Sequence, residues 1–330
     1  MTRKLLAMVV AGIVSSLAIP GDASAQPLWK GYTFFSTTNH PDYQHLEKFA
    51  KELEKITGGK IRTKVNVGGS LPIPGTAVTQ AVGEGTLTFA HDGFFTGNLP
   101  LGGLTNLPLL TTSSHEDFRK AITILEPYLA KELDKRGVKL LATYNFPLQT
   151  IWATNKLDSL ADLKGKKMRV NNQPQADFMR RFEATPVTLA TADVAPALER
   201  STVEGLTTAS AGGGRLWGDM LKYNYRLGLN YDLMLYIANK AAFEKLPADM
   251  QAKVVEAARK DAAELTKELA DSEDVVTAQL KAKGMVVHVP DDKVRAEALE
   301  RVRPYWDEWA KATSPEAVEV LAKVRKEVGK

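Results

Sequence analysis

The sequence predicts an α/β fold, because segments with strand character alternate with segments with helix character along most of the chain. Hydrophobic residues make up 44% of the 330 residues and charged residues 25%, which is typical of a globular protein with a packed core. Residues 247–283 are rich in Ala, Lys, Glu and Leu and predict one helix roughly 50 Å long. A helix of that length exceeds the diameter of one lobe, so we expect it to underlie two lobes.

The first half of the chain has the strand–helix order of a mainly parallel sheet. Leu46, Phe49 and Leu53 fall on one face of a predicted helix, and Gly58 and Gly59 end it. The next segment, "KIRTKVNV", alternates apolar and polar residues as a half-buried strand does. Strands are predicted at residues 31–37, 60–67 and 87–95, and helices at residues 40–59 and 75–85.

The second half repeats this order. Strands are predicted at residues 138–145, 148–155, 167–170, 186–190 and 203–210, and helices at residues 115–137, 175–183 and 193–200. Asp193 is predicted to cap the helix that follows it, since a short side-chain oxygen can accept from unpaired helix amides. The run Gly212–Gly214 lacks the spacing of a phosphate-binding loop and predicts a flexible crossover between lobes instead.

Residues 1–25 have the pattern of a secretory signal. Arg3 and Lys4 precede an apolar run over residues 5–19, and Ala-Ser-Ala ends at Ala25, where cleavage is predicted. A retained N-terminal anchor is the alternative. No later segment approaches the roughly 20 apolar residues of a spanning helix, so we expect an exported protein.

Composition and motifs exclude several functions. Cysteine is absent, which excludes disulfides, thiolate nucleophiles and Cys-ligated zinc or iron–sulfur sites. The net charge of +4 comes from basic residues scattered among acidic ones, so nucleic acid is not an expected partner. No cofactor and no metal site are predicted.

Arg169 lies in the short predicted strand of "DLKGKKMRV", between Met168 and Val170. A cation in this position faces either water or a cleft. Its planar guanidinium matches the two oxygens of a carboxylate and stays charged, which lysine cannot reproduce. The alternative is an internal ion pair with Asp193 or Glu204.

The chain resembles the solute-binding proteins of tripartite ATP-independent periplasmic (TRAP) transporters. The resemblance covers almost the whole chain after the signal and is carried by "FAKELEKITGGKI", "DLKGKKMRV", "ATPVTLATADVAPALERSTVEGL" and "NKAAFEKLPADMQAKVVEAA". "DLKGKKMRV" followed by "ATPV" is its most specific part.

This resemblance implies a periplasmic-binding-protein-like fold with two lobes, a hinge and a long helix across both. It implies a signal peptide over residues 1–25, a first lobe from residues 26–147 and 236–272, and a second from residues 148–235 and 273–330. It also implies that a small organic acid binds between the lobes in the periplasm and passes to a membrane permease. Arg169 would bind its carboxylate.

Departures from the family pattern bear on the ligand. A second arginine is common where this chain has Thr150, beside Gln149, and an asparagine is common where it has Thr208. Fewer charged contacts indicate one carboxylate rather than two. Phe94, Trp152 and Trp217 are candidates to contact an apolar or aromatic body, with ordinary core packing as the alternative.

Four further polar residues are candidate ligand contacts. His91 and Asp92 end a predicted strand, where α/β proteins place ligand groups, although a surface pair is equally consistent with the pattern. Asn171 and Asn172 follow Arg169 and could hydrogen-bond a hydroxyl or keto group, or form the turn before Pro174.

Two other functions stay open at this level. A binding protein that presents an organic acid to a sensor kinase would have the same sequence features. A secreted hydrolase or lyase using His91 and Asp92 is the second alternative, although the chain lacks a G-x-S-x-G elbow and an H-E-x-x-H motif. The oligomeric state is not predicted.

Overall fold

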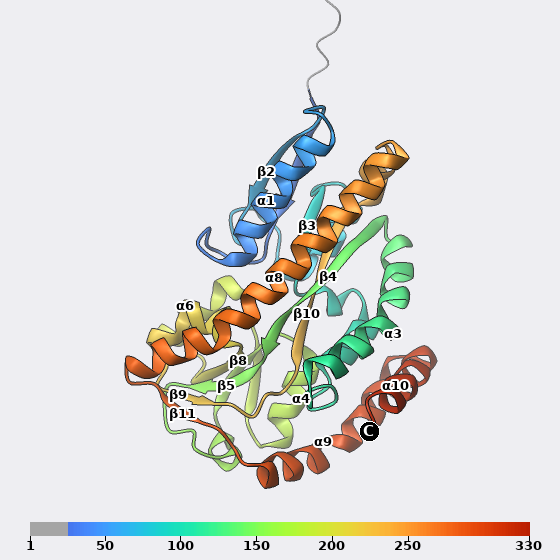
Figure 1. Ribbon diagram of the computed structural model, residues 1–330. Coiled ribbons are helices and arrows are strands. Elements are labelled where there is room, and N and C mark those ends of the chain that lie inside the picture. Colours follow the sequence, from blue (N-terminus) through green and yellow to red (C-terminus); the bar gives the residue numbers. More distant parts are fainter. Residues whose placement is uncertain (1–25) are drawn as a thin grey trace, which may run out of the picture.

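The computed structural model describes residues 26–330, and the predicted signal over residues 1–25 lies outside them. Two β-sheets, each covered by helices, form two lobes, and one long helix crosses both (Figure 1). Among the described residues, none of the helices combines the length and apolar character needed to cross a membrane.

The first lobe is built on a five-stranded sheet in the order β2-β1-β3-β10-β4. β2, β1 and β3 are parallel, whereas β10 runs antiparallel to both β3 and β4. The strands are β1 Leu28–Tyr32, β2 Arg62–Asn66, β3 Phe89–Asp92, β4 Val138–Leu148 and β10 Tyr231–Asn239. The helices beside them are α1 Pro41–Ile56, α2 Val78–Gly83, α3 His115–Asp134 and α7 Lys240–Glu244.

The second lobe is built on a six-stranded sheet in the order β11-β9-β5-β8-β6-β7. β8, β6 and β7 are parallel, and β5 is antiparallel to both of its neighbours. The strands are β5 Thr150–Ala153, β6 Lys167–Val170, β7 Thr185–Thr188, β8 Gly205–Thr208, β9 Tyr223–Tyr225 and β11 Val286–His288. The helices are α4 Gln173–Arg181, α5 Val194–Glu199 and α6 Arg215–Trp217.

Two extended segments join the sheets side by side. β4 ends at Leu148 and β5 begins at Thr150, while the chain returns between β9 and β10. The amide of Gln149 donates to the carbonyl of Asn230 at 2.7 Å, and the amide of Leu229 donates to the carbonyl of Gln149 at 2.7 Å. These paired crossings keep the strands of the two lobes in a fixed register at their junction.

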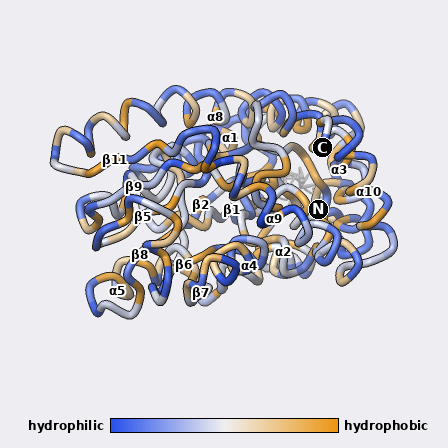
Figure 2. Tube along the Cα trace, turned by 90° about the horizontal axis from the view of Figure 1, so that it is seen from below, coloured by the Kyte–Doolittle hydropathy of each residue, from blue (hydrophilic) through white to orange (hydrophobic). Residues whose placement is uncertain are grey.

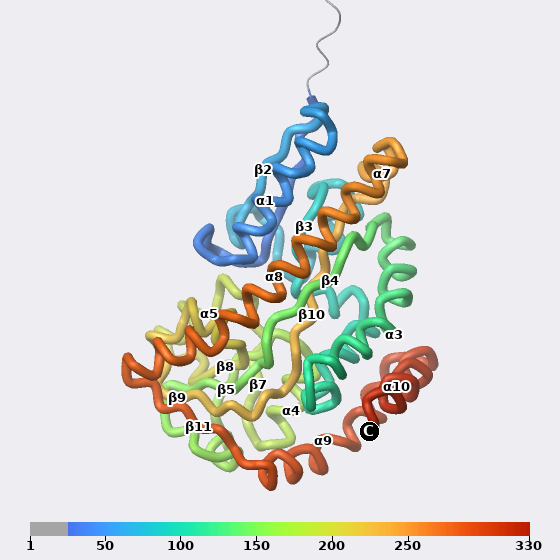
Figure 3. The backbone as a smooth tube through the Cα atoms, in the orientation of Figure 1, coloured from blue at the N-terminus to red at the C-terminus, as the bar shows by residue number. Residues whose placement is uncertain are grey.

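The long helix α8, Ala248–Ala282, extends along both lobes (Figures 1 and 3). In the first lobe, Asp261 lies 3.0 Å from the ring of His45 on α1. In the second, both oxygens of Glu273 accept amides of the chain, from Ser210 at 3.1 Å and Ala211 at 2.8 Å. The expected helix across two lobes is therefore present, and it is bonded to each.

The C-terminal helices α9, Asp292–Thr313, and α10, Pro315–Glu327, differ from the sequence-based division of the chain. Ala298 and Val302 of α9 pack in the core of the second lobe. From Tyr305 onward α9 and α10 pack in the core of the first lobe, α9 against the turn at residues 100–106 and α10 against α3. The assignment of residues 273–330 to the second lobe is thus wrong for this end of the chain, because its apolar face covers α3. Pro304 lies between the two packing regions.

Hydrophilic and hydrophobic residues alternate along α8 (Figure 2), and apolar residues such as Val254, Leu265 and Leu269 are among its buried ones. Three details differ from expectation. Both sheets are mixed rather than mainly parallel. Asp193 has helical backbone angles and makes no capping bond. Residues 210–214, where the sequence predicted a flexible crossover at Gly212–Gly214, form a buried helical turn.

The hydrogen bonds of Glu273, which join α8 to the second lobe, generate a stability prediction. Arg226 donates to Glu273 at 3.0 Å, so Glu273→Ala leaves this cation and two buried amides without their acceptor. The free energy of unfolding should fall by about 2–4 kcal/mol, measured by urea denaturation. Asp271→Ala, on the exposed face of α8, is the control and should change it by less than about 0.5 kcal/mol. Equal losses in the two variants would contradict this role of Glu273.

Candidate functional site

A small cavity of about 40 Å³ lies between the lobes. Its walls come from both sheets and from the buried turn at residues 210–214. The lining residues are Phe34, Phe35, Gly93, Phe94, Phe146, Gln149, Arg169, Asn171, Thr191, Thr208, Gly212, Gly213, Trp217, Asp232 and Met234. One cation and one carboxylate therefore face an otherwise neutral cavity.

Arg169 is the buried cation of this cavity, with 3% of its surface exposed. It lies on β6, and its Nε donates to the carbonyl of Leu189 at 3.0 Å, which fixes the plane of the guanidinium. Its Nη1 makes only a long contact, 3.5 Å, to the carbonyl of Thr207. Among the described residues no carboxylate forms an ion pair with it, and neither Asp193 nor Glu204 does. Burial lowers the pKa of Arg169 to about 10, so it remains charged at neutral pH.

Asp232 is the buried carboxylate of the cavity, at the start of β10. Its two oxygens accept from the side-chain amides of Asn230 at 2.7 Å and Asn171 at 2.8 Å. Burial raises the pKa of Asp232, while these two amides and the charge of Arg169 act in the opposite direction. The bond from Asn171 joins the second lobe to the first directly beside the cavity.

Two glycines allow the turn at residues 210–214 to reach the cavity. A Cβ on Gly213 would lie 2.2 Å from the ring of Trp217, and one on Gly212 would lie 3.2 Å from the ring of Phe146. The Gly213 amide donates to Thr208 Oγ1 at 2.9 Å. Trp217 in turn lies under the guanidinium of Arg169, 5.6 Å from ring to Cζ, where a cation–π attraction holds it.

The opposite wall of the cavity is apolar. Phe34 and Phe94 meet edge to face with ring centroids 5.8 Å apart. Gly93 between them has no room for a side chain, because a Cβ there would lie 2.8 Å from the sulfur of Met234. This wall belongs to the first lobe, so a bound molecule would contact apolar surface on one side and Arg169 on the other.

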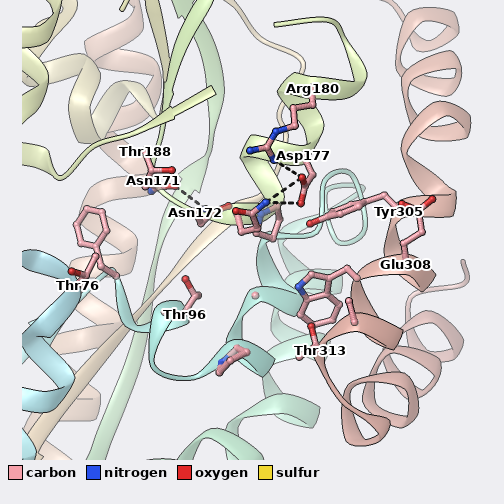
Figure 4. Close-up of a pocket in the computed structure, with 18 of the residues that line it drawn as sticks. Thr76, Thr96, Asn171, Asn172, Asp177, Arg180, Thr188, Tyr305, Glu308 and Thr313 are labelled. Carbon is pink, nitrogen blue, oxygen red and sulfur yellow. Dashed lines mark hydrogen bonds and ion pairs between the residues drawn. The ribbon is translucent and has the colours of Figure 1, made fainter. Parts of the chain in front are cut away.

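A larger open groove of about 800 Å³ adjoins the cavity, and Phe94 and Asn171 line both. Asn171, Asn172 and Asp177 lie on one side of this groove, and Tyr305 and Glu308 of α9 lie on the other (Figure 4). Among its described lining residues the cations are Arg180 and Arg181, and both are more exposed than Arg169.

The structure brings six of the eleven predicted site residues together on the cavity: Gln149, Arg169, Asn171, Thr208, Phe94 and Trp217. Asn172 lines only the outer groove, and its side chain caps α4 by accepting from the amide of Gln175 at 2.9 Å. The remaining four, His91, Asp92, Thr150 and Trp152, do not line the cavity.

Those four residues belong to the interior of the lobes. The indole of Trp152 donates to the carbonyl of Thr208 at 2.9 Å, and the hydroxyl of Thr150 donates to the same carbonyl at 3.2 Å. His91 Nδ1 lies 3.0 Å from Asp42 Oδ1, and both side chains are fully buried in the first lobe. Asp92 accepts from the hydroxyl of Thr79 and from the amide of Phe94 at 2.9 Å.

Sequence reasoning missed several cavity residues, above all Asp232, Phe34, Thr191 and Met234. Asp232 carried a usable signal, since a carboxylate inside an otherwise apolar strand is rarely buried without a partner. Within residues 26–330, no group of three or more His, Asp or Glu side chains is arranged to hold a metal ion.

Two mixed α/β lobes, a helix across both and a charged cavity between them define a two-lobed solute-binding protein. Residues 34–312 match the model of the bacterial extracellular solute-binding protein family 7, and the chain belongs to this family. Its members are TRAP solute-binding receptors and not enzymes.

Individual relatives agree with this assignment. A solute-binding protein of Verminephrobacter eiseniae is 30% identical over 269 residues, 76% of each chain. The 2,3-diketo-L-gulonate-binding periplasmic protein of Escherichia coli is 26% identical over 310 residues, which cover 90% of this chain and 92% of that one. The crystal structure of DctP7, a Bordetella pertussis extracytoplasmic solute receptor binding pyroglutamic acid, has a TM-score of 0.82 at 24% identity, covering 91% of this chain and 99% of that one.

The buried carboxyl of Asp92 generates a pH prediction. Burial raises its pKa from 3.8 to about 6, so the folded protein retains this proton more strongly than the unfolded chain does. The resulting loss of folding stability is absent in acid and develops as the pH rises from about 4 to about 6. Relative to Asp92→Asn, the wild type should lose up to about 3 kcal/mol of unfolding free energy between pH 4 and pH 7. Urea denaturation at both pH values measures this difference, and a pH-independent difference would contradict it.

Proposed function

We propose that this protein captures a small organic acid with a single carboxylate between its lobes in the periplasm and delivers it to the membrane subunits of a TRAP permease. The observation that carries this proposal is the buried Arg169, which faces the cavity without a carboxylate partner of its own among the described residues. A buried cation is costly unless an anion pairs with it. The carboxylate of the ligand supplies that anion.

Arg169 is oriented for a carboxylate. Nε donates to the carbonyl of Leu189, and the outer edge formed by the two Nη groups carries only the long contact of Nη1 with the carbonyl of Thr207. Two parallel N–H groups can then meet two carboxylate oxygens. Closure of the lobes excludes water and strengthens this pair by lowering the local dielectric. Together with burial of apolar surface, it supports the roughly 8 kcal/mol that corresponds to micromolar affinity.

The remaining lining residues support one carboxylate on a compact body. Arg169 is the only cation on the cavity, within the part of the chain that the structure describes, and Asp232 would repel a second carboxylate. Phe34, Phe94 and Met234 offer an apolar wall to the rest of the molecule. The small volume favours a short or cyclic acid over an extended one.

The relatives support an acid as the class of ligand. The Escherichia coli relative is named for 2,3-diketo-L-gulonate, and the Bordetella pertussis receptor binds pyroglutamic acid. Each of these compounds carries one carboxylate. The secretory signal predicted over residues 1–25, with cleavage after Ala25, supports export of the protein.

A thermal-shift screen of the purified protein tests the class of ligand. The panel contains compact monocarboxylates, aromatic monocarboxylates and small dicarboxylates, each with its amide as an uncharged control. Monocarboxylates should raise the melting temperature, and their amides and the dicarboxylates should not. Stabilisation by the amides would contradict a charge-based site.

Substitution of Arg169 tests its geometry. Arg169→Ala should weaken the best monocarboxylate of the screen by at least about 3 kcal/mol, since it removes a buried charged partner. Arg169→Lys should lose nearly as much, because an ammonium cannot form two parallel bonds. Titration calorimetry measures both. Arg136→Lys, at the exposed end of α3, is the matched control and should bind as the wild type does. Near-wild-type affinity of Arg169→Lys would reject the bidentate contact.

A further inference from the structure

Asp232 is a charged cavity residue that the capture of a carboxylate does not use. It is buried, it lines the cavity with Arg169, and its charge acts on the guanidinium. A carboxylate beside the position of an anionic ligand opposes binding unless a hydrogen-bond donor lies between the two. Asp232 therefore imposes a chemical requirement on the ligand.

The hydrogen bonds around Asp232 leave its carboxylate able to accept further hydrogen bonds. Asn230 and Asn171 each donate one N–H, and each bond goes to a different oxygen of the carboxylate. An ionised carboxylate has about four acceptor positions, so one on each oxygen remains. The two amides thus hold the side chain in place, and each of its oxygens can accept one more hydrogen bond.

The other polar side chains of the cavity, apart from Arg169 and Asp232, are neutral, and some of their groups are already bonded. Thr208 Oγ1 accepts from the amide of Gly213 and donates to the carbonyl of Ala209. The amide nitrogen of Gln149 donates to the carbonyl of Pro147 at 3.0 Å. Among the described lining residues, Asp232 is the one carboxylate, and so the strongest hydrogen-bond acceptor available to a ligand.

We infer that the ligand carries an N–H or O–H group close to its carboxylate, and that Asp232 accepts a hydrogen bond from this group while Arg169 binds the carboxylate. The inference rests on the proposed function, because it assigns the second contact of the same ligand. The small cavity requires the two groups to be separated by only a few bonds. The ligand class is therefore a compact acid with a lactam N–H, an amide N–H or a hydroxyl next to the carboxylate-bearing carbon.

Two matched pairs of acids test this requirement on the wild-type protein. Pyroglutamate has a ring N–H, and 3-oxocyclopentane-1-carboxylate has a methylene in its place. 2-Hydroxy-3-methylbutanoate has a hydroxyl that 3-methylbutanoate lacks. In at least one pair the donor-bearing acid should bind about 100-fold more tightly in titration calorimetry, because without the donor the ligand carboxylate and Asp232 face each other with no hydrogen bond between them. Equal affinities within both pairs, or no binding by any of the four acids, would overturn the inference.

Asp232→Asn assigns the selectivity to this side chain. The ratio of affinities within the selective pair should fall to within about threefold. Asp219→Asn, at an exposed ion pair with Lys283, is the matched control and should keep the ratio of the wild type. Circular dichroism verifies that both variants are folded, and should Asp232→Asn not fold, the wild-type ratios decide alone.

Binding of the same acids to Arg169→Ala distinguishes a failure of the proposed function from a failure of the inference on Asp232. Loss of binding in Arg169→Ala together with an unchanged ratio in Asp232→Asn would leave the proposed function standing and overturn the inference on Asp232. Retained binding in Arg169→Ala would overturn both.

Discussion

The structure depends on one electrostatic constraint: a guanidinium is held almost free of solvent between two lobes, with no ion pair to a carboxylate among the described residues. Leu189 and Trp217 orient Arg169, but a carbonyl and an aromatic face only partly replace the hydration that burial removes. The cavity therefore favours an anion before any other contact is considered. Asp232, which lines the same cavity, adds a negative charge that acts on this guanidinium.

The scaffold makes this arrangement possible by holding the two lobes in register. Gln149 lies in the paired crossing segments and also lines the cavity, so the junction of the lobes and the site share a residue. α8 is bonded to the first lobe through Asp261 and to the second through Glu273. The turn that Glu273 caps is the same turn whose glycines allow Trp217 to lie under Arg169. Stability and binding geometry are thus coupled through a few backbone contacts.

The sequence predicted the α/β class and most helices, because each rests on a local pattern. For Arg169 the pattern left a cleft and an internal ion pair open, and the family resemblance indicated the cleft. A permanent cation in a short strand is visible without knowledge of the fold. Thr150 was expected at the site from the family pattern and Trp152 as a candidate aromatic contact, but both side chains donate to the carbonyl of Thr208 inside the lobe. Asp232 was not predicted, since its exposure to the cavity depends on how β10 meets the other lobe. The local pattern, a carboxylate inside an apolar strand, indicates a buried partner but not that the partner lies in the other lobe.

The helix α9 passes from the core of one lobe to the core of the other, and Pro304 lies where it changes partners. Proline lacks the amide that would bond to the preceding turn, so the helix bends there more easily than elsewhere. Any separation of the lobes has to be absorbed by this segment as well as by the crossings near Gln149. The lobes are therefore tied at three places, by α8, by α9 and by the crossings near Gln149, and a hinge between them would have to bend at all three.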